Sequence, residues 1–130
     1  MMKTLTLVVA GAALLAGCAT AATQANPDLD PSATQFTGWV RVSNGEFQLF
    51  QEQRDLDNAP SPTTCVSGAL PRDAQAAAGD LNGVQATFTG RTALWSERDG
   101  VQTLMHEGAR ITNQCRGDYV IKADSVRVLR

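Results

Sequence analysis

The sequence predicts a small, mainly β domain: a closed or partly open barrel of five to six strands with one short helix. Apolar and polar side chains alternate with a period of two in several segments after residue 35, which is the pattern of half-buried strands. Asn44-Gly45 and Asn82-Gly83 are typical of tight turns between strands, and residues 71–81 show the one helical pattern. A small β-sandwich is the alternative architecture.

The first two predicted strands form a hairpin. Residues 36–42 place an apolar or small side chain at every second position, and Asn44-Gly45 then supplies two residues that tolerate positive φ. Phe47 and Leu49 continue the apolar face on the return strand, where Gln48 is among the polar positions. We therefore expect one buried face and one polar face.

A long polar loop and the helix follow the hairpin. Residues 54–64 contain two prolines and several acidic or amide side chains, which predicts a loop that ends at a short strand over residues 65–70. Pro71 then occupies the first turn of a helix, and Gly79 closes its alanine-rich run.

The remaining strands occupy the C-terminal half. Residues 84–91 alternate most clearly, and a turn over residues 97–100 leads to strand-like positions within 101–113. A further turn precedes the final strand positions over residues 119–128. The order of hairpin, third strand, helix and two more strands resembles an OB-fold over residues 36–130. The segment 101–113 is longer than a minimal OB-fold needs, which leaves a sixth strand or a sandwich open.

The N-terminus has the features of a secretory signal. Lys3 is followed by an apolar run that ends at Leu15-Ala16-Gly17-Cys18. The run is shorter than the roughly 20 residues of a membrane span, and a short anchor or buried helix is the alternative. The tetrapeptide resembles the lipobox of bacterial lipoproteins, in which the cysteine thiol receives a diacylglyceryl group, the chain is cleaved before it, and the new amine is acylated.

This resemblance implies a domain organisation and a location. Residues 1–17 would be the cleaved signal peptide, 18–35 a lipidated flexible tether rich in Ala, Thr and Pro, and 36–130 a single β domain. Acyl chains such as palmitate on Cys18 would attach the protein to the membrane. Because alanine rather than aspartate follows Cys18, the resemblance implies the outer membrane of the cell envelope, facing the periplasm.

The other two cysteines form an even pair. With Cys18 used for lipid, Cys65 and Cys115 remain, and in an exported protein we expect them to form a disulfide. A redox pair or a reactive thiol is the alternative, but the sequence has no Cys-x-x-Cys spacing.

The charges do not indicate a nucleic-acid partner. Eleven basic and thirteen acidic residues give a formal net charge of −2, and removal of Lys3 with the signal leaves ten against thirteen, which is −3. The arginines are spread singly along the chain, whereas nucleic-acid binders usually carry a basic cluster. We therefore expect partners in the envelope, and no nucleic acid.

His106 is the only histidine. We expect it to be exposed on a strand or loop; the alternative is a general base beside a serine or cysteine. No Gly-x-Ser-x-Gly elbow is present, and one histidine with two bridged cysteines is too few ligands for structural zinc. The sequence therefore predicts no catalytic residue, no metal and no cofactor.

Two pairs of acidic residues are candidate sites. Asp28 and Asp30 fall in the predicted tether, and Asp55 and Asp57 in the polar loop. Paired acids serve in calcium binding or glycoside cleavage, but the further ligands and the glycine of a calcium loop are missing. We expect solvated loop acids.

Three aromatic residues are candidates for a ligand-binding surface. Trp39, Phe50 and Trp95 fall opposite the predicted core positions or at strand ends. If exposed together, they would form a stacking surface; if covered by a barrel end or the helix, they would be core.

The sequence therefore favours a non-catalytic envelope lipoprotein whose β domain binds a protein, a glycan or a small molecule. The alternatives are a small envelope hydrolase that uses His106 and an inhibitor of an envelope enzyme.

Overall fold

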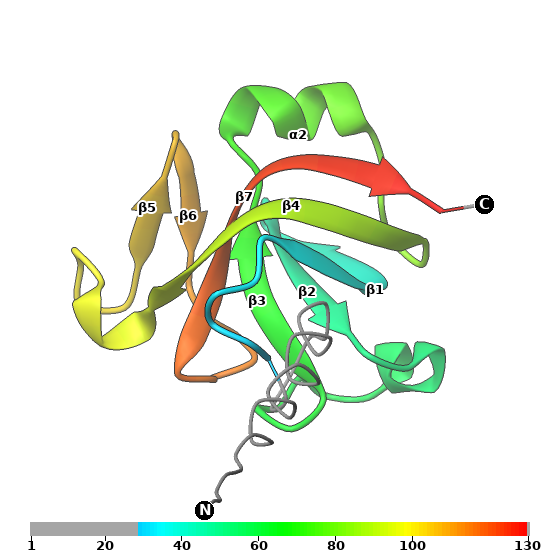
Figure 1. Cartoon of the computed structure of the whole chain (residues 1–130), viewed down its shortest axis with the longest axis horizontal. Helices are drawn as coiled ribbons and strands as arrows, with labels where there is room; N and C mark the ends of the chain where they lie inside the picture. The colour runs from blue at the N-terminus through cyan, green and yellow to red at the C-terminus, as the bar shows by residue number, and fades with distance from the viewer. Residues whose placement is uncertain (1–28, 130) are drawn as a thin grey trace, which may run out of the picture.

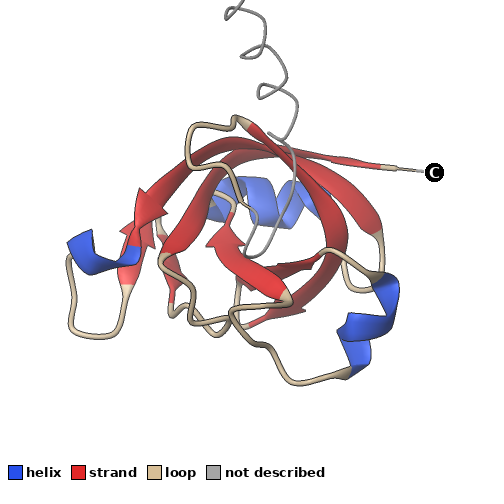
Figure 2. Cartoon of the chain, turned by 60° about the horizontal axis from the view of Figure 1, so that its bottom comes forward, coloured by secondary structure: helices blue, strands red, loops and turns tan. Residues whose placement is uncertain are grey.

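Five strands close into a barrel in the computed structural model, which describes residues 29–129 (Figures 1 and 2). The order around the barrel is β1-β2-β3-β7-β4, with β4 paired back to β1. The pairs are antiparallel except for β3 with β7. The predicted mainly β barrel is confirmed, and the structure is not the alternative sandwich. Its strands are β1 (Gln35–Ser43), β2 (Glu46–Phe50), β3 (Cys65–Ala69), β4 (Gln85–Leu94) and β7 (Tyr119–Val128).

The helix α2 (Arg72–Ala78) lies between β3 and β4, as the sequence predicted, and ends at Gly79 with φ 73°. This order is that of an OB-like barrel with an addition between β4 and β7. We call residues 95–118 the insert. It contains the 3₁₀ turn η4 (Trp95–Glu97) and a hairpin of two short strands, β5 (Leu104–His106) and β6 (Ala109–Ile111). Figure 1 shows this hairpin at one side of the barrel.

The polar loop between β2 and β3 contains one more 3₁₀ turn, η3 (Gln53–Asp57). In the region predicted to be strand-like over residues 101–113, only the two three-residue strands form. Val101 instead lies in a bend and is 82% exposed. Among the described residues, no helix has the length and apolar character needed to cross a membrane.

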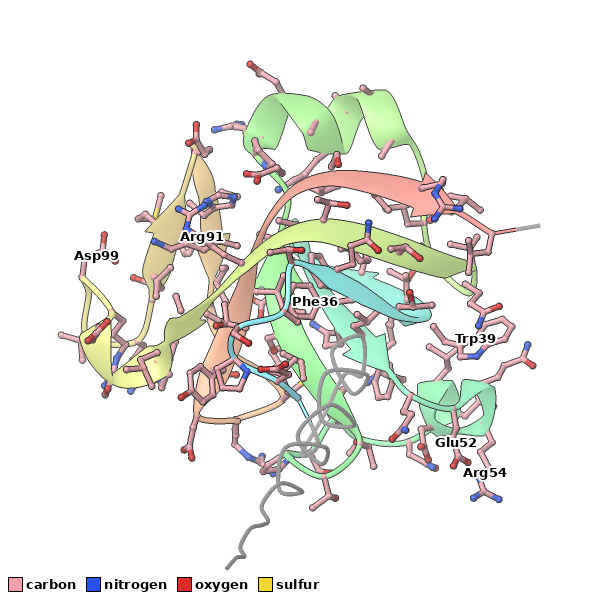
Figure 3. All side chains as sticks on the ribbon, in the orientation of Figure 1. Phe36, Trp39, Glu52, Arg54, Arg91 and Asp99 are labelled. Carbon is pink, nitrogen blue, oxygen red and sulfur yellow. A yellow bond between two sulfur atoms is a disulfide. The ribbon has the colours of Figure 1, made fainter. Side chains whose placement is uncertain are left out.

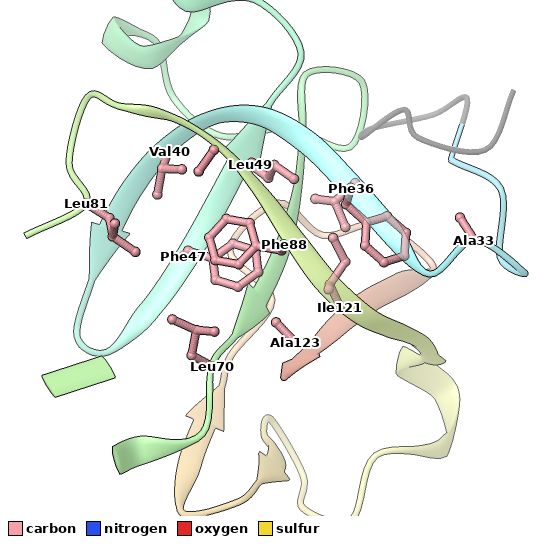
Figure 4. Packing of buried hydrophobic residues seen from close by; sticks show 12 residues of the cluster. Ala33, Phe36, Val40, Phe47, Leu49, Leu70, Leu81, Phe88, Ile121 and Ala123 are labelled. Atoms are coloured by element: carbon pink, nitrogen blue, oxygen red, sulfur yellow. The ribbon is translucent and has the colours of Figure 1, made fainter. Parts of the chain in front are cut away.

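The barrel interior is filled by the side chains that the alternation marked as apolar. Phe47 and Phe88 stack at its centre, with ring centroids 3.9 Å apart and an interplanar angle of 14° (Figure 4). The tight hairpin at Asn44-Gly45 is also confirmed, with φ of 56° and 81°. The largest apolar residues of this cluster are Phe36, Val40, Phe47, Leu49, Val66, Leu70, Leu81, Phe88 and Ile121.

Glycines occupy positions where neighbouring barrel strands approach each other closely, Gly68 and Gly90 among them. A Cβ at Gly68 would lie 2.5 Å from the Ile121 carbonyl oxygen, and one at Gly90 would lie 2.2 Å from that of Lys122. Gly68 sits where β3 pairs with β7, and Gly90 follows a register shift in the β4–β7 pair. A side chain at either position would push neighbouring strands apart.

The contacts of the domain begin before Phe36. Ala33 is part of the barrel core, Gly90 N–H donates to the Thr34 carbonyl at 2.9 Å, and the Thr92 hydroxyl donates to the Pro31 carbonyl at 2.7 Å. Residues 29–34, which the sequence placed in the tether, therefore pack along β4. The predicted signal peptide, Cys18 and the tether up to residue 28 lie outside the described residues.

Candidate functional site

The outer face of β2 and β3, where OB-fold proteins commonly bind ligands, is covered by the insert. Glu46, Gln48 and Ser67 project on this face, and each is at most 2% exposed. The expectation that Gln48 occupies a solvent-facing polar position is therefore wrong. The alternation located the inner face correctly, but a second layer covers the outer one.

Glu46 is the main attachment point of this layer. Its Oε1 accepts hydrogen bonds from the Thr112 N–H and hydroxyl, both at 2.7 Å. Its Oε2 accepts from the N–H groups of Asn113 at 3.0 Å and Gln114 at 3.3 Å. A carboxylate has about four acceptor positions, so both oxygens are fully used. Hydrogen bonds to a charged acceptor are stronger than neutral ones, and they stabilise this buried charge.

Ser67 and the disulfide hold the next residue of the insert. Cys115 N–H donates to the Ser67 hydroxyl oxygen at 3.0 Å, and Cys115 is bonded to Cys65, with their Cα atoms 5.7 Å apart. The predicted Cys65–Cys115 disulfide is confirmed. Residues 112–115 are thus fixed to β2 and β3 by hydrogen bonds and a covalent bond.

One donor and one acceptor in this layer have no hydrogen-bond partner among the described residues, Gln48 Nε2 and Asn113 Oδ1. Gln48 pairs with Ser67 in the strand register, so it lies beneath the same segment that Ser67 holds. Buried polar groups are usually satisfied by protein or by ordered water.

Phe50 is not part of an exposed surface. It is 0% exposed and packs with the Cys65–Cys115 disulfide, and the Arg41 guanidinium lies 4.8 Å from its ring centroid. Of the two outcomes that the sequence left open for Phe50, the covered one is found, because the disulfide brings the insert over the end of β2.

Trp39 and Trp95 are both half-buried, but they pack into different clusters. Trp39 contacts the cluster of Phe50 and the disulfide, whereas Trp95 packs against the hairpin side of the barrel. Figure 3 shows Trp39 on the side opposite Asp99 of the insert. The Arg98 guanidinium lies 4.9 Å from the Trp95 ring centroid. The two tryptophans therefore do not form one stacking surface.

Trp95 instead lines an open groove of about 530 Å³, which we call the amide groove. Its walls come from the loop before β3, from η4 and from the outward side of residues 112–116. Three amides, one aromatic ring and one guanidinium are among the residues that line it, and of the amides Asn113 is buried. The lining residues are Ala59, Pro60, Trp95, Gln102, Thr112, Asn113, Gln114 and Arg116. Such a surface offers both donors and acceptors and contains no carboxylate.

His106 is buried rather than exposed. It is 4% exposed, and its Nε2 donates to the Ala123 carbonyl oxygen at 2.7 Å. The expectation of an exposed histidine is wrong because β5 packs against β7. The two cysteines considered as nucleophiles are joined to each other. The ring of His106 therefore fixes the hairpin to the barrel.

The candidate acids are separate. Asp30 accepts hydrogen bonds from the N–H of Ser32 at 2.9 Å and from its hydroxyl at 2.7 Å, and these two bonds hold the pKa of Asp30 below its ordinary value. Asp55 accepts from the Asn58 amide at 3.5 Å, Asp57 is exposed, and Asp28 lies outside the described residues. Within residues 29–129 no group of three or more potential ligands is placed to hold a metal ion.

Comparisons with protein-family models, with curated proteins and with solved structures find no match to this chain. The function is therefore inferred from the residues and their arrangement. The roles of Glu46 and Ser67 in holding the insert were not predicted from the sequence, although the predicted disulfide already indicated where the insert lies. A bond from Cys115 to Cys65 requires the insert to lie on the strand that contains Cys65.

Proposed function

We propose that the protein is a lipid-anchored, non-catalytic binding protein of the bacterial cell envelope. The sequence Leu15-Ala16-Gly17-Cys18 after a short apolar run carries this proposal. Two or three acyl chains at Cys18 would give stable attachment to the outer membrane, whereas one chain binds only marginally. The residues between Cys18 and the barrel would hold the domain close to the membrane on the periplasmic side.

We further propose that the domain binds a neutral glycan in the amide groove. Sugar hydroxyls both donate and accept hydrogen bonds, which suits the side chains of Gln102 and Gln114, and Trp95 adds an apolar wall. OB-like barrels bind oligosaccharides near the β2–β3 face. In this chain the insert covers that face, so a ligand would meet the outward side of the insert.

The surroundings of His106 support binding rather than hydrolysis. Its Nε2 is engaged by a main-chain carbonyl, and the side chain is buried. A general base needs access to the proton that it removes. A hydrolase that uses His106 would require the hairpin to move away from β7.

The anchor is tested by mass spectrometry of the full chain purified from membranes. We expect a mature N-terminus at Cys18 carrying acyl chains, and we expect Cys18→Ser to remove the lipid. An intact Met1 on the wild-type protein would contradict the proposal.

Glycan binding is tested by calorimetry with N-acetylglucosamine oligomers and the full chain in detergent. We expect Gln102→Ala and Gln114→Ala each to weaken binding about tenfold, since a hydrogen bond to the sugar is lost. Gln35→Ala, at an exposed glutamine of β1 outside the groove, is the matched control and should bind as wild type does. If the wild-type protein shows no saturable heat, the glycan proposal is wrong, and the lipid anchor is unaffected.

A further inference from the structure

We propose that a second site, separate from the amide groove, binds a carboxylate or phosphate group. It is a cleft of about 520 Å³ between α2, the β1–β2 turn and the β5–β6 hairpin, which we call the arginine cleft. The residues that carry the proposal are Asn44, Arg72, Gln75, Gly108 and Arg110. This site goes beyond the proposed function, because it requires neither the lipid anchor nor a glycan.

Three segments that are distant in sequence form the walls, and hydrogen bonds fix them to each other. Arg72 N–H donates to the Glu107 carbonyl at 3.0 Å, which joins the start of α2 to the hairpin turn. Gln75 Nε2 donates to the Gly45 carbonyl at 2.9 Å, which joins α2 to the β1–β2 turn. The cleft is therefore formed before any ligand arrives, and preorganisation lowers the cost of binding.

The hairpin turn also approaches the helix closely. A Cβ built on Gly108, whose φ is 84°, would lie 3.2 Å from Arg72 Cβ. Arg72 on α2 and Arg110 on β6 therefore lie on neighbouring elements. Both side chains are exposed at the cleft.

Neither arginine of the cleft forms an ion pair among the described residues. The ion pair within residues 29–129 joins Arg54 to Glu52, at η3 (Figure 3), and involves neither Arg72 nor Arg110. Glu46 is the acid that lines the cleft, but it is 2% exposed and its oxygens are used by residues 112–114. The guanidinium groups are therefore available to an external anion.

The chemistry of these donors selects an anionic group. A guanidinium presents a planar set of N–H donors that matches carboxylate and phosphate oxygens, often in pairs. Two of them beside the exposed Asn44 amide offer donors from different sides of one cleft. Asp73 of α2 and Glu107 of the β5–β6 turn are nearby acids in the sequence, but neither lines the cleft. An acidic ligand fits these donors better than a neutral or basic one.

The experiment is an NMR titration of the ¹⁵N-labelled full chain in zwitterionic detergent with inorganic phosphate, and separately with acetate, at constant ionic strength. We expect saturable shifts of the Asn44, Arg72 and Arg110 signals, and a loss of affinity of about tenfold in Arg72→Gln or Arg110→Gln. Arg127→Gln, on β7 outside the cleft, should bind as wild type does. Saturation with phosphate alone selects a phosphate ligand, and saturation with both anions supports the shared chemistry.

Shifts that rise linearly with anion concentration without saturating, or that persist in the Arg72→Gln/Arg110→Gln double variant, would overturn the proposal. Trp95→Ala and Cys18→Ser separate this site from the proposed function. We expect both variants to retain the anion response, whatever their effect on glycan binding or on lipidation.

Discussion

The Glu46 carboxylate accepts two hydrogen bonds of 2.7 Å from Thr112, although 66 positions separate these residues in the sequence. Glu46 is 2% exposed, and within the described part of the chain no Lys, Arg or His lies within ion-pair distance of it. Its charge is stabilised by N–H and O–H donors instead. This contact fastens the insert to the strand face that it covers.

Substitution of Glu46 should therefore destabilise the domain. Glu46→Gln replaces one acceptor oxygen by an NH₂ group that faces N–H donors, and we expect a loss of about 2–3 kcal/mol in the free energy of unfolding, measured with urea. Glu52→Gln is the matched control, because Glu52 forms an exposed pair with Arg54 and exposed pairs contribute about 0–1 kcal/mol. Equal effects of the two substitutions would refute the anchoring role of Glu46.

The disulfide should stabilise the same layer. Its cysteines are 50 positions apart, and the chain-entropy estimate for a loop of this size is roughly 4 kcal/mol. We expect Cys65→Ala/Cys115→Ala to lower the unfolding free energy by up to about this amount. In hydrogen-exchange mass spectrometry, residues 112–115 should lose more protection than β1. Unchanged protection of that segment would contradict the prediction, and reduction of the wild-type protein should reproduce the effect of the double variant.

The barrel was predictable because apolar residues alternate with polar ones along its strands, and the apolar residues form its inner face. Phe36 and Val40 on β1, and Phe47 and Leu49 on β2, recur with the period of a strand and are buried, so burial and alternation agree. The outer face was not predictable in the same way. Gln48 and His106 have the polar character expected at a solvent-facing position, yet both are buried. The insert covers Gln48, and the hydrogen bond of His106 to Ala123 fixes the β5–β6 hairpin to the barrel.

The arginine cleft had no sequence signal. Arg72 and Arg110 look like the other singly spaced arginines, and only the packing of α2 beside the hairpin places them at one cleft. The covering of β2 and β3 had one signal, the pairing of Cys65 with Cys115. A covalent bond fixes proximity, whereas exposed charges carry no information about which segment they will face.

Gly68 should tolerate no side chain. In Gly68→Ala the new Cβ would lie 2.5 Å from the Ile121 carbonyl oxygen and 2.6 Å from Phe47 Cζ, in a strand pair and a packed core. We expect a loss of at least about 1–3 kcal/mol in urea unfolding. Gly117→Ala is the control, because its Cβ would meet only the Tyr119 oxygen at 3.7 Å, which is ordinary contact. A Gly68→Ala protein as stable as Gly117→Ala would show that β3 and β7 are not held this closely.

His106 should be a stabilising residue. His106→Ala removes the donor to the buried Ala123 carbonyl and leaves a cavity beneath β5, so we expect a loss of about 2–4 kcal/mol in the unfolding free energy. His106→Phe retains the volume of the side chain but not the donor. We expect its loss of unfolding free energy to be smaller than that of His106→Ala and to report the contribution of the hydrogen bond alone. Met105→Ala, on the same strand and 44% exposed, is the control and should change stability little. A His106→Ala protein of wild-type stability that had lost a hydrolytic activity would instead favour the enzyme alternative, because a catalytic base contributes to turnover rather than to packing.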